Sequence, residues 1–178
     1  GLDTLDADLG NIDDAADRYN RLDAFLTEYV APLGRWDVVL IDLPGLTNNV
    51  AYNGLFAAGN VIAPVEMGPF EAEQADALSD DLERLAENYA GADLRLELVL
   101  PNKVDLRTNM ADEYLEAFEE EYPDAIAPSA VPYSQDIRNA ADEGRTAFSL
   151  EEPSSTANRA RAAYLDAAQQ LVNRGASA

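Results

Sequence analysis

The chain has 178 residues, 47% of them hydrophobic and 26% charged, which is enough for one domain with a sizeable core. It contains no cysteine and no histidine, so disulfides, thiolate catalysis, cysteine metal sites and the usual general base are excluded. Acidic residues outnumber basic ones by 34 to 12, giving a net charge of −22, and Lys103 is the single lysine.

An acidic excess spread over the whole chain, with lysine almost absent, is typical of proteins from salt-loving microbes; the alternative is an acidic protein of a mesophile. No apolar run approaches the roughly 20 residues of a membrane span, and no basic-then-apolar signal segment opens the chain. We therefore expect a cytoplasmic protein. Its first residue, Gly1 in place of methionine, indicates that the chain begins after processing, cleavage or truncation.

Apolar spacing predicts the first elements. Residues 1–13 are polar with scattered apolar positions, which favours an edge strand or an extended segment. Residues 14–31 carry apolar side chains at helical spacing and predict an amphipathic helix that ends near Pro32 and Gly34. Trp36 is interpreted as a packing residue where the chain enters the next strand.

A continuous apolar run at residues 38–41 predicts a strand buried on both faces, as in a parallel sheet. Asp42 falls at the carboxyl end of this strand, which is the edge of an open α/β sheet where ligands bind. A second apolar strand over residues 61–65 follows a helix-length connection, so the three elements are predicted to form a βαβ unit.

The rest of the chain alternates between helices and strands. The pattern predicts a long helix over 75–89, a strand over 94–100, a helix capped by Thr108 or Asn109, an edge strand at best over 125–131, a short helix capped by Ser134 and a final helix capped by Ser154 or Ser155. The predicted fold class is α/β, a mostly parallel twisted sheet with helices on both faces, in a single domain over residues 1–178.

The sequence from Asp42 onward resembles the ParA/MinD family of partition ATPases. D-L-P-G, followed by A-A-G-N-V-I-A-P-V-E, is similar to that family's D-x-P-P, a helix ending A-A-D, and a strand closing in I-P-V. Gly45 departs from the pattern, because the family usually has a second proline there. A larger departure is that the family's phosphate-binding loop, K-G-G-x-G-K-[ST], does not occur in this sequence. The resemblance implies a P-loop NTPase-like fold of the deviant Walker (SIMIBI) type, N-terminally incomplete and missing the strand that carries the loop.

The resemblance also implies a role for Asp42. In nucleotide hydrolases an acid at the end of a strand holds the magnesium ion, usually through water, beside the phosphates. The alternative is an aspartate that only caps a turn at the end of its strand. We therefore predict Asp42 as the magnesium ligand.

The tetrapeptide N-K-V-D, at residues 102–105, follows a predicted strand. In GTP-binding proteins this motif reads the guanine base, and D-x-P-G resembles their magnesium-side motif, so a GTPase fragment is a serious alternative. The continuation D-L-R-T-N is closer to the partition ATPases, in which a loop at the same topological position contacts the base. We assign Asn102, Lys103 and Asp105 to base recognition, with adenine favoured over guanine.

Pro132 and Tyr133, just before the helix predicted at Ser134, resemble the segment that covers the base in the partition ATPases; the alternative is an ordinary turn. The family implies ATP and Mg²⁺ as ligands of an intact member, a homodimer, and a partner protein that stimulates hydrolysis. Phosphate binding needs a glycine-rich loop and a lysine on the terminal phosphates. We therefore expect these 178 residues alone to hydrolyse nucleotide poorly or not at all, with no catalytic residue among them.

Three hypotheses for the function follow. The first is a ParA-like ATPase that acts in plasmid or chromosome partitioning as a nucleotide-dependent dimerising switch. The second is a GTPase fragment, and the third is a non-catalytic remnant or interaction protein of the same fold. We do not expect direct DNA contact, because the candidate arginines lie on a chain of opposite net charge and salt weakens such binding; they are Arg107, Arg138, Arg145, Arg159 and Arg161.

The absent strand has a structural consequence. In the family it lies between the D-x-P-P strand and the rest of the sheet. Its removal leaves backbone hydrogen-bonding edges unpaired, which is costly. We expect such a chain to be marginally stable unless the sheet rearranges or another chain fills the gap.

Thermal stability is expected to rise with salt. A net charge of −22 repels itself in the compact state, and the Debye length falls from about 10 Å at 0.1 M to about 3 Å at 1 M. Melting followed by circular dichroism should give a midpoint that increases steadily over this range, in KCl and, as a control for ion-specific effects, in NaCl. A midpoint that does not move with salt would favour the mesophile alternative.

Overall fold

The computed structural model describes residues 2–44, 48–66, 68–89 and 93–175. By its internal contacts the chain divides into two compact units. The first unit comprises Gly1–Val61 with Asp81–Arg95, and the second comprises residues 62–80 with residues 96–178.

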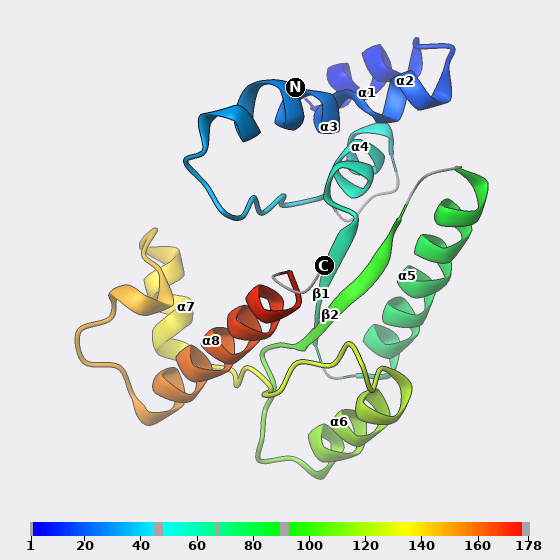
Figure 1. Ribbon diagram of the computed structural model, residues 1–178. Coiled ribbons are helices and arrows are strands. Elements are labelled where there is room, and N and C mark those ends of the chain that lie inside the picture. Colours follow the sequence, from blue (N-terminus) through cyan, green and yellow to red (C-terminus); the bar gives the residue numbers. More distant parts are fainter. Residues whose placement is uncertain (1, 45–47, 67, 90–92, 176–178) are drawn as a thin grey trace. The chain divides into compact units, whose positions relative to one another are not determined.

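A two-stranded sheet is formed by β1 (Asn60–Val65) and β2 (Arg95–Pro101). The two strands run in the same direction (Figure 1). The amide of Arg95 donates to the carbonyl of Gly59 at 3.0 Å near the start of both strands, and the amide of Asn102 donates to the carbonyl of Val65 at 2.7 Å near their ends. The predicted parallel α/β sheet is confirmed.

The second unit carries the predicted helices on both sides of β2. They are α6 (Asn109–Glu121), α7 (Gln135–Asp142), the short 3₁₀ helix η3 (Ala147–Ser149) and α8 (Ser155–Gly175), while α5 (Pro69–Asn88) connects β1 to β2. Local sequence signals set the helix starts. The side chains of Thr108, Ser134 and Ser154 accept amide hydrogens three residues on, at 3.3, 3.5 and 3.2 Å, as N-caps do.

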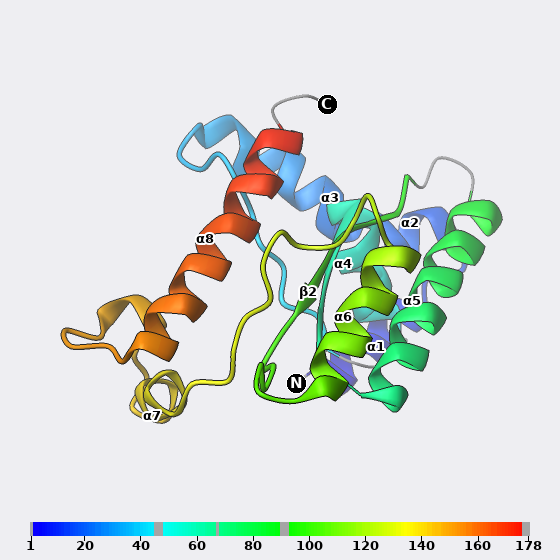
Figure 2. The same ribbon diagram turned by 90° about the horizontal axis from the view of Figure 1, so that it is seen from below.

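Two apolar clusters cover the faces of β2. On one face, Leu98 and Leu100 pack with the inner side of α8, which is built from the small residues Ala160, Ala163 and Ala167. On the other face, Val99 packs with residues of β1 and with Phe118 of α6. Figure 2 shows α8 and α6 on opposite sides of β2. Residues 125–131 form no strand, although Ile126 makes a single parallel bridge to Val99.

The first unit opens with a helix, so the prediction of an edge strand or extended segment over residues 1–13 is wrong. Residues 2–10 form α1 (Leu2–Gly10), which packs against α4 (Asn49–Ala58). Leu9 is buried, and the Asp6 carboxylate accepts the amide hydrogen of Asn49 at 2.7 Å. These contacts lie about 40 residues away in sequence, so the local pattern of residues 1–13 could not indicate them.

The single helix predicted over residues 14–31 is helical but broken. It consists of α2 (Ala15–Tyr19), α3 (Arg21–Phe25), the π-helical turn η1 (Leu26–Val30) and the 3₁₀ turn η2 (Ala31–Leu33). Gly34 ends it with φ +56°, a left-handed conformation that glycine adopts without steric cost, as predicted from its position.

Asn53 of α4 explains the break between α2 and α3. Its buried side chain donates to the carbonyls of Arg18 and Asn49, both at 2.9 Å. Its amide oxygen accepts from the amides of Arg21 and Leu22 at 3.1 and 3.3 Å, which are among the first N–H groups of α3. Because the start of a helix leaves these donors without intrahelical partners, a side chain from α4 completes the new helix end.

An aromatic cluster holds the same elements together. The ring of Tyr19 lies 5.5 Å from Tyr52, 5.8 Å from Phe56 and 5.4 Å from Tyr89, between ring centroids. The guanidinium of Arg18 sits 5.6 Å from the Tyr19 ring centroid. Burial, with the hydrogen bond and charge of Tyr19, raises the pKa of the Tyr89 hydroxyl. The cluster joins α2 and α4 to the end of α5.

The strand predicted over residues 38–41 is not formed. The chain from residue 36 to 44 has no regular secondary structure, and Val38, Val39 and Leu40 are 62%, 51% and 79% exposed. The physical reason is the absence of a neighbour: within the described ranges, no backbone–backbone hydrogen bond involves residues 36–44. Trp36, expected to pack, is itself 58% exposed.

Replacing Asn53 with alanine should destabilise the fold by about 1–3 kcal/mol, because part-buried backbone donors and acceptors lose their partners. Urea denaturation at constant salt measures the change. The matched variant Asn109→Ala, at an exposed position on α6, should stay within about 0.5 kcal/mol of the unaltered chain. Equal losses for the two variants would contradict the role given to Asn53.

Candidate functional site

Polar residues collect where β1 and β2 end. Glu66 directly follows β1 and Asn102 directly follows β2, and parallel strands end at the same edge of a sheet. The Nζ of Lys103 donates to the carboxylate Oε1 of Glu66 at 2.6 Å. An ion pair therefore links the residues that follow the two strands. Glu66 had no predicted role, and its partner is 37 residues away in sequence.

The chain turns sharply at Lys103. Its φ of +54° is in the left-handed region, which costs a non-glycine residue about 1–2 kcal/mol. The turn is held by the Asn102 side chain, whose Oδ1 accepts the Lys103 amide hydrogen at 3.0 Å and the Tyr164 hydroxyl hydrogen at 3.4 Å. Partial burial raises the pKa of Tyr164. Strained backbone of this kind is concentrated at ligand sites.

The Asp105 carboxylate is engaged on both oxygens by one guanidinium. Arg107 Nε donates to Oδ1 and Nη2 to Oδ2, each at 2.7 Å, and the Arg107 amide donates to Oδ1 at 3.2 Å. Hydrogen bonding to Arg107 lowers the pKa of Asp105 to about 2. Asp105 is therefore ionised throughout the neutral range, and the pair is lost only as the pH falls toward 2.

A second segment lies against this loop. The amide of Val104 donates to the carbonyl of Val131, and the amide of Tyr133 donates to the carbonyl of Val104, both at 3.0 Å. This parallel bridge places Pro132 and Tyr133 beside residues 102–105, so the five residues predicted for base recognition come together.

The aromatic ring of Tyr133 is available at this surface. The residue is 43% exposed, whereas Pro132 beside it is buried. The Tyr133 hydroxyl donates to Gln135 Oε1 at 3.0 Å and accepts from Arg138 Nη1 at 3.5 Å. That contact raises the pKa of the Arg138 guanidinium. The site thus offers an exposed ring, an amide group and a backbone loop, which is what recognition of a planar base requires.

Asp42 belongs to the first unit and is exposed. It follows no strand, since residues 38–41 form none, and Gly45 of its motif lies outside the described residues. Over the described ranges, no group of three or more acidic residues could hold a metal ion. A single carboxylate supplies one of the six ligands that Mg²⁺ takes, so the others would come from water and phosphate. The magnesium role of Asp42 stays a prediction.

The arginines considered for DNA contact have partners within the chain. Arg145 pairs with Glu143 at 2.5 Å, and Arg161 donates to the carbonyls of Ala147 and Leu150 at 2.7 and 2.6 Å. Arg159 approaches the Thr156 hydroxyl at 3.5 Å. These side chains fix local loops and offset local acids.

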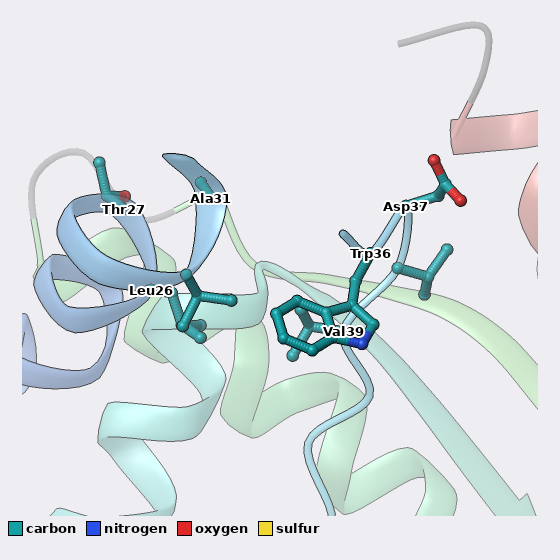
Figure 3. A pocket seen from close by; sticks show the side chains of 8 residues that line it. Leu26, Thr27, Ala31, Trp36, Asp37 and Val39 are labelled. Carbon is teal, nitrogen blue, oxygen red and sulfur yellow. The ribbon is translucent and has the colours of Figure 1, made fainter. Parts of the chain in front are cut away.

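A pocket of about 180 Å³ occurs in the first unit, and none of the predicted site residues lines it. Leu26 of η1 lies on one side of the pocket, and Trp36 and Val39 lie on the other (Figure 3). Its lining is mostly apolar.

Among the described helices, none combines the length and apolar character needed to cross a membrane.

No family model matches the chain. It is 26% identical over 140 residues to the sporulation initiation inhibitor protein Soj of Bacillus subtilis (strain 168), covering 79% of this chain and 53% of Soj. It is 25% identical over 145 residues to the cell division protein PomZ of Myxococcus xanthus (strain DK1622), covering 78% of this chain and 43% of PomZ. The chain thus spans about half the length of the curated relatives it matches.

Solved structures of ATP-binding proteins are also similar to this chain. The ATP complex of a McdA variant from Cyanothece matches with a TM-score of 0.65 and 19% identity, over 93% of this chain and 62% of McdA. Cobyrinic acid a,c-diamide synthase from Mycobacterium smegmatis, with bound ATP analogue and magnesium, matches with a TM-score of 0.56 and 25% identity, over 82% and 62%. The resemblance to ParA/MinD-type ATPases is confirmed in sequence and in fold.

Substituting Arg107 by alanine should raise the pKa of Asp105 from about 2 toward about 3.9, because the hydrogen bonds that stabilise the carboxylate are lost. An NMR titration of the aspartate carboxyl carbons reports the change. Arg145→Ala, which removes a guanidinium paired with Glu143, should leave Asp105 unaltered. An Asp105 that already titrates near 3.9 in the unaltered chain would contradict the pairing.

Proposed function

We propose that this chain is the base-recognising part of a ParA-like ATPase that acts in plasmid or chromosome partitioning or positioning. One observation carries the proposal: the bridge between Val104 and Pro132 sets the N-K-V-D loop beside an exposed tyrosine, at the edge where two parallel strands end. Ligands of open α/β sheets bind at that edge.

Tyr133 would stack on the base and Asn102 would hydrogen-bond its edge. Oδ1 of Asn102 already accepts from the Lys103 amide and the Tyr164 hydroxyl, so the amide nitrogen would donate to a ring nitrogen of adenine. The GTPase alternative needs a free aspartate carboxylate to accept the two N–H groups of guanine. Both oxygens of Asp105 are instead held by Arg107, so guanine recognition would first have to open this exposed ion pair, at a cost of about 0–1 kcal/mol, which is a small bias toward adenine.

ATP with Mg²⁺ is the ligand expected for the whole protein, and Asp42 would supply one oxygen ligand to the metal. The sequence contains no glycine-rich phosphate loop, and its single lysine lies in the base loop, paired with Glu66. These 178 residues would therefore bind the base end of the nucleotide without hydrolysing it. Homodimerisation on ATP, a stimulating partner protein and a cytoplasmic, high-salt setting complete the proposal.

Nucleotide binding to the chain tests this function. We expect fluorescently labelled ATP to bind weakly and to be displaced by ATP in preference to GTP, with Mg²⁺ and KCl held constant. Tyr133→Ala should weaken binding about tenfold, since stacking of a base on an aromatic ring contributes about 1–3 kcal/mol.

The matched control is Tyr29→Ala, which removes an exposed tyrosine of η1 in the other unit and should leave binding unchanged. Preferential displacement by GTP would favour the GTPase alternative. Absence of binding by either nucleotide would favour the non-catalytic interaction protein.

A further inference from the structure

Tyr164 of α8 reaches the candidate site from the core of the second unit. Its ring packs against the apolar cluster that Leu98 and Leu100 form with the inner face of α8. Its hydroxyl lies 3.4 Å from Oδ1 of Asn102, the residue that directly follows β2 and is 62 residues away in sequence. Because protein cores are closely packed, the ring is held in place and the hydroxyl has a fixed position beside Asn102.

The side chain of Asn102 is held through its oxygen. Oδ1 accepts the Lys103 amide hydrogen at 3.0 Å and the Tyr164 hydroxyl hydrogen at 3.4 Å, which together use both lone pairs of this oxygen. In the part of the chain that the structure describes, the amide nitrogen Nδ2 donates to no acceptor, and it is not one of the buried side-chain atoms that lack a partner. The two N–H groups of the amide are therefore open to solvent.

Both contacts select the same orientation of the Asn102 amide. Exchanging Oδ1 and Nδ2 would set the amide nitrogen against the N–H of Lys103, so that two donors would face each other. Partial burial raises the pKa of the Tyr164 hydroxyl. The hydroxyl therefore stays protonated in the neutral range and keeps a hydrogen to donate to Oδ1.

We propose that Tyr164 is a positioning residue of the nucleotide site, because its hydroxyl fixes the Asn102 amide so that only N–H groups face a bound base. The inference rests on the proposed function, in which Asn102 contacts the base. Tyr164 does not touch the nucleotide and acts through Asn102 alone. The ligand that fits is a base with a ring nitrogen that accepts a hydrogen bond, as in a purine.

The contact to Lys103 alone leaves the amide more freedom. The torsion that turns an asparagine amide has a broad energy well, so one hydrogen bond from the neighbouring residue restricts it weakly. A second donor on the same oxygen, carried by a ring anchored in the core, narrows this rotation before a ligand binds. Ordering a side chain in advance reduces the entropy cost of association. The net free energy of one neutral hydrogen bond supports an effect of about three- to tenfold on affinity.

Binding of fluorescently labelled ATP to Tyr164→Phe measures this contribution. Phenylalanine keeps the ring in the core and removes only the hydroxyl, so the fold should be retained. With Mg²⁺ and KCl held constant, we expect the dissociation constant to rise about three- to tenfold. The matched control is Tyr114→Phe, which removes the hydroxyl of another partly buried tyrosine, on α6, and should leave binding unchanged.

A double-mutant cycle separates positioning from a role that does not involve Asn102. If Tyr164 acts only through the amide, its hydroxyl has nothing to position once the amide is removed. In the Asn102→Ala background, Tyr164→Phe should therefore weaken ATP binding by less than about 1.5-fold. A loss of the same size in both backgrounds would show that the hydroxyl acts independently of Asn102, and would overturn the proposal.

NMR of the chain without nucleotide reports on the amide itself. The side-chain N–H signals of Asn102 are identified by their absence in Asn102→Ala. Tyr164→Phe should shift these signals and lower their order parameter below about 0.6, the range of flexible groups. Tyr114→Phe should not change them. Signals that stay the same in Tyr164→Phe would overturn the positioning role even if ATP binding were weaker.

The outcomes distinguish this inference from the proposed function. If Tyr133→Ala weakens ATP binding and Tyr164→Phe does not, the positioning role is wrong and the proposed function stands. If the unaltered chain binds no ATP, the proposed function fails and the positioning role fails with it, whatever the NMR signals of the amide show.

Discussion

The structure depends on one constraint: an apolar run becomes a strand only when a neighbour takes up its backbone hydrogen bonds. The runs at residues 38–41 and 61–65 are similarly rich in β-branched and apolar side chains. The second pairs with β2 and is a strand; the first pairs with no other strand in the described part of the chain and is exposed. The site at the ends of β1 and β2 follows from the pair that formed, because the Asn102 amide is fixed on the Val65 carbonyl.

Features set by adjacent residues could be predicted from the sequence, and features set by distant ones could not. The cap at Ser134 was predicted, and Thr108 and Ser154 were each one of two predicted caps; the prediction was possible because a cap is a local interaction over three residues. The helix at residues 2–10 and the break at Asn20 were not. Both depend on α4, which lies 30 to 40 residues further along, and no spacing of apolar residues encodes such contacts.

The candidate site divides in the same way. Motif resemblance identified residues 102–105 and 132–133 as one group, and the Val104–Pro132 bridge brings them together. The Glu66–Lys103 pair was not foreseen, since 37 residues separate its members. The Asp105–Arg107 pair could have been, because an acid and an arginine two residues apart in a turn are within reach of each other. Asp42 was placed at a strand end that does not exist, so its role rests on resemblance alone.

The free energies of the interactions at the candidate site indicate which part of it is fixed before a ligand binds. Exposed ion pairs contribute about 0–1 kcal/mol, and the members of both pairs at the site are 45% to 88% exposed. Stacking of a base on Tyr133 would contribute about 1–3 kcal/mol, enough to open either pair. The backbone is different: the left-handed turn at Lys103 is held by the Asn102 side chain, and the Val104 bridge by two hydrogen bonds. In the proposed site, backbone geometry would therefore set where a base lies, and the ion pairs would adjust to it.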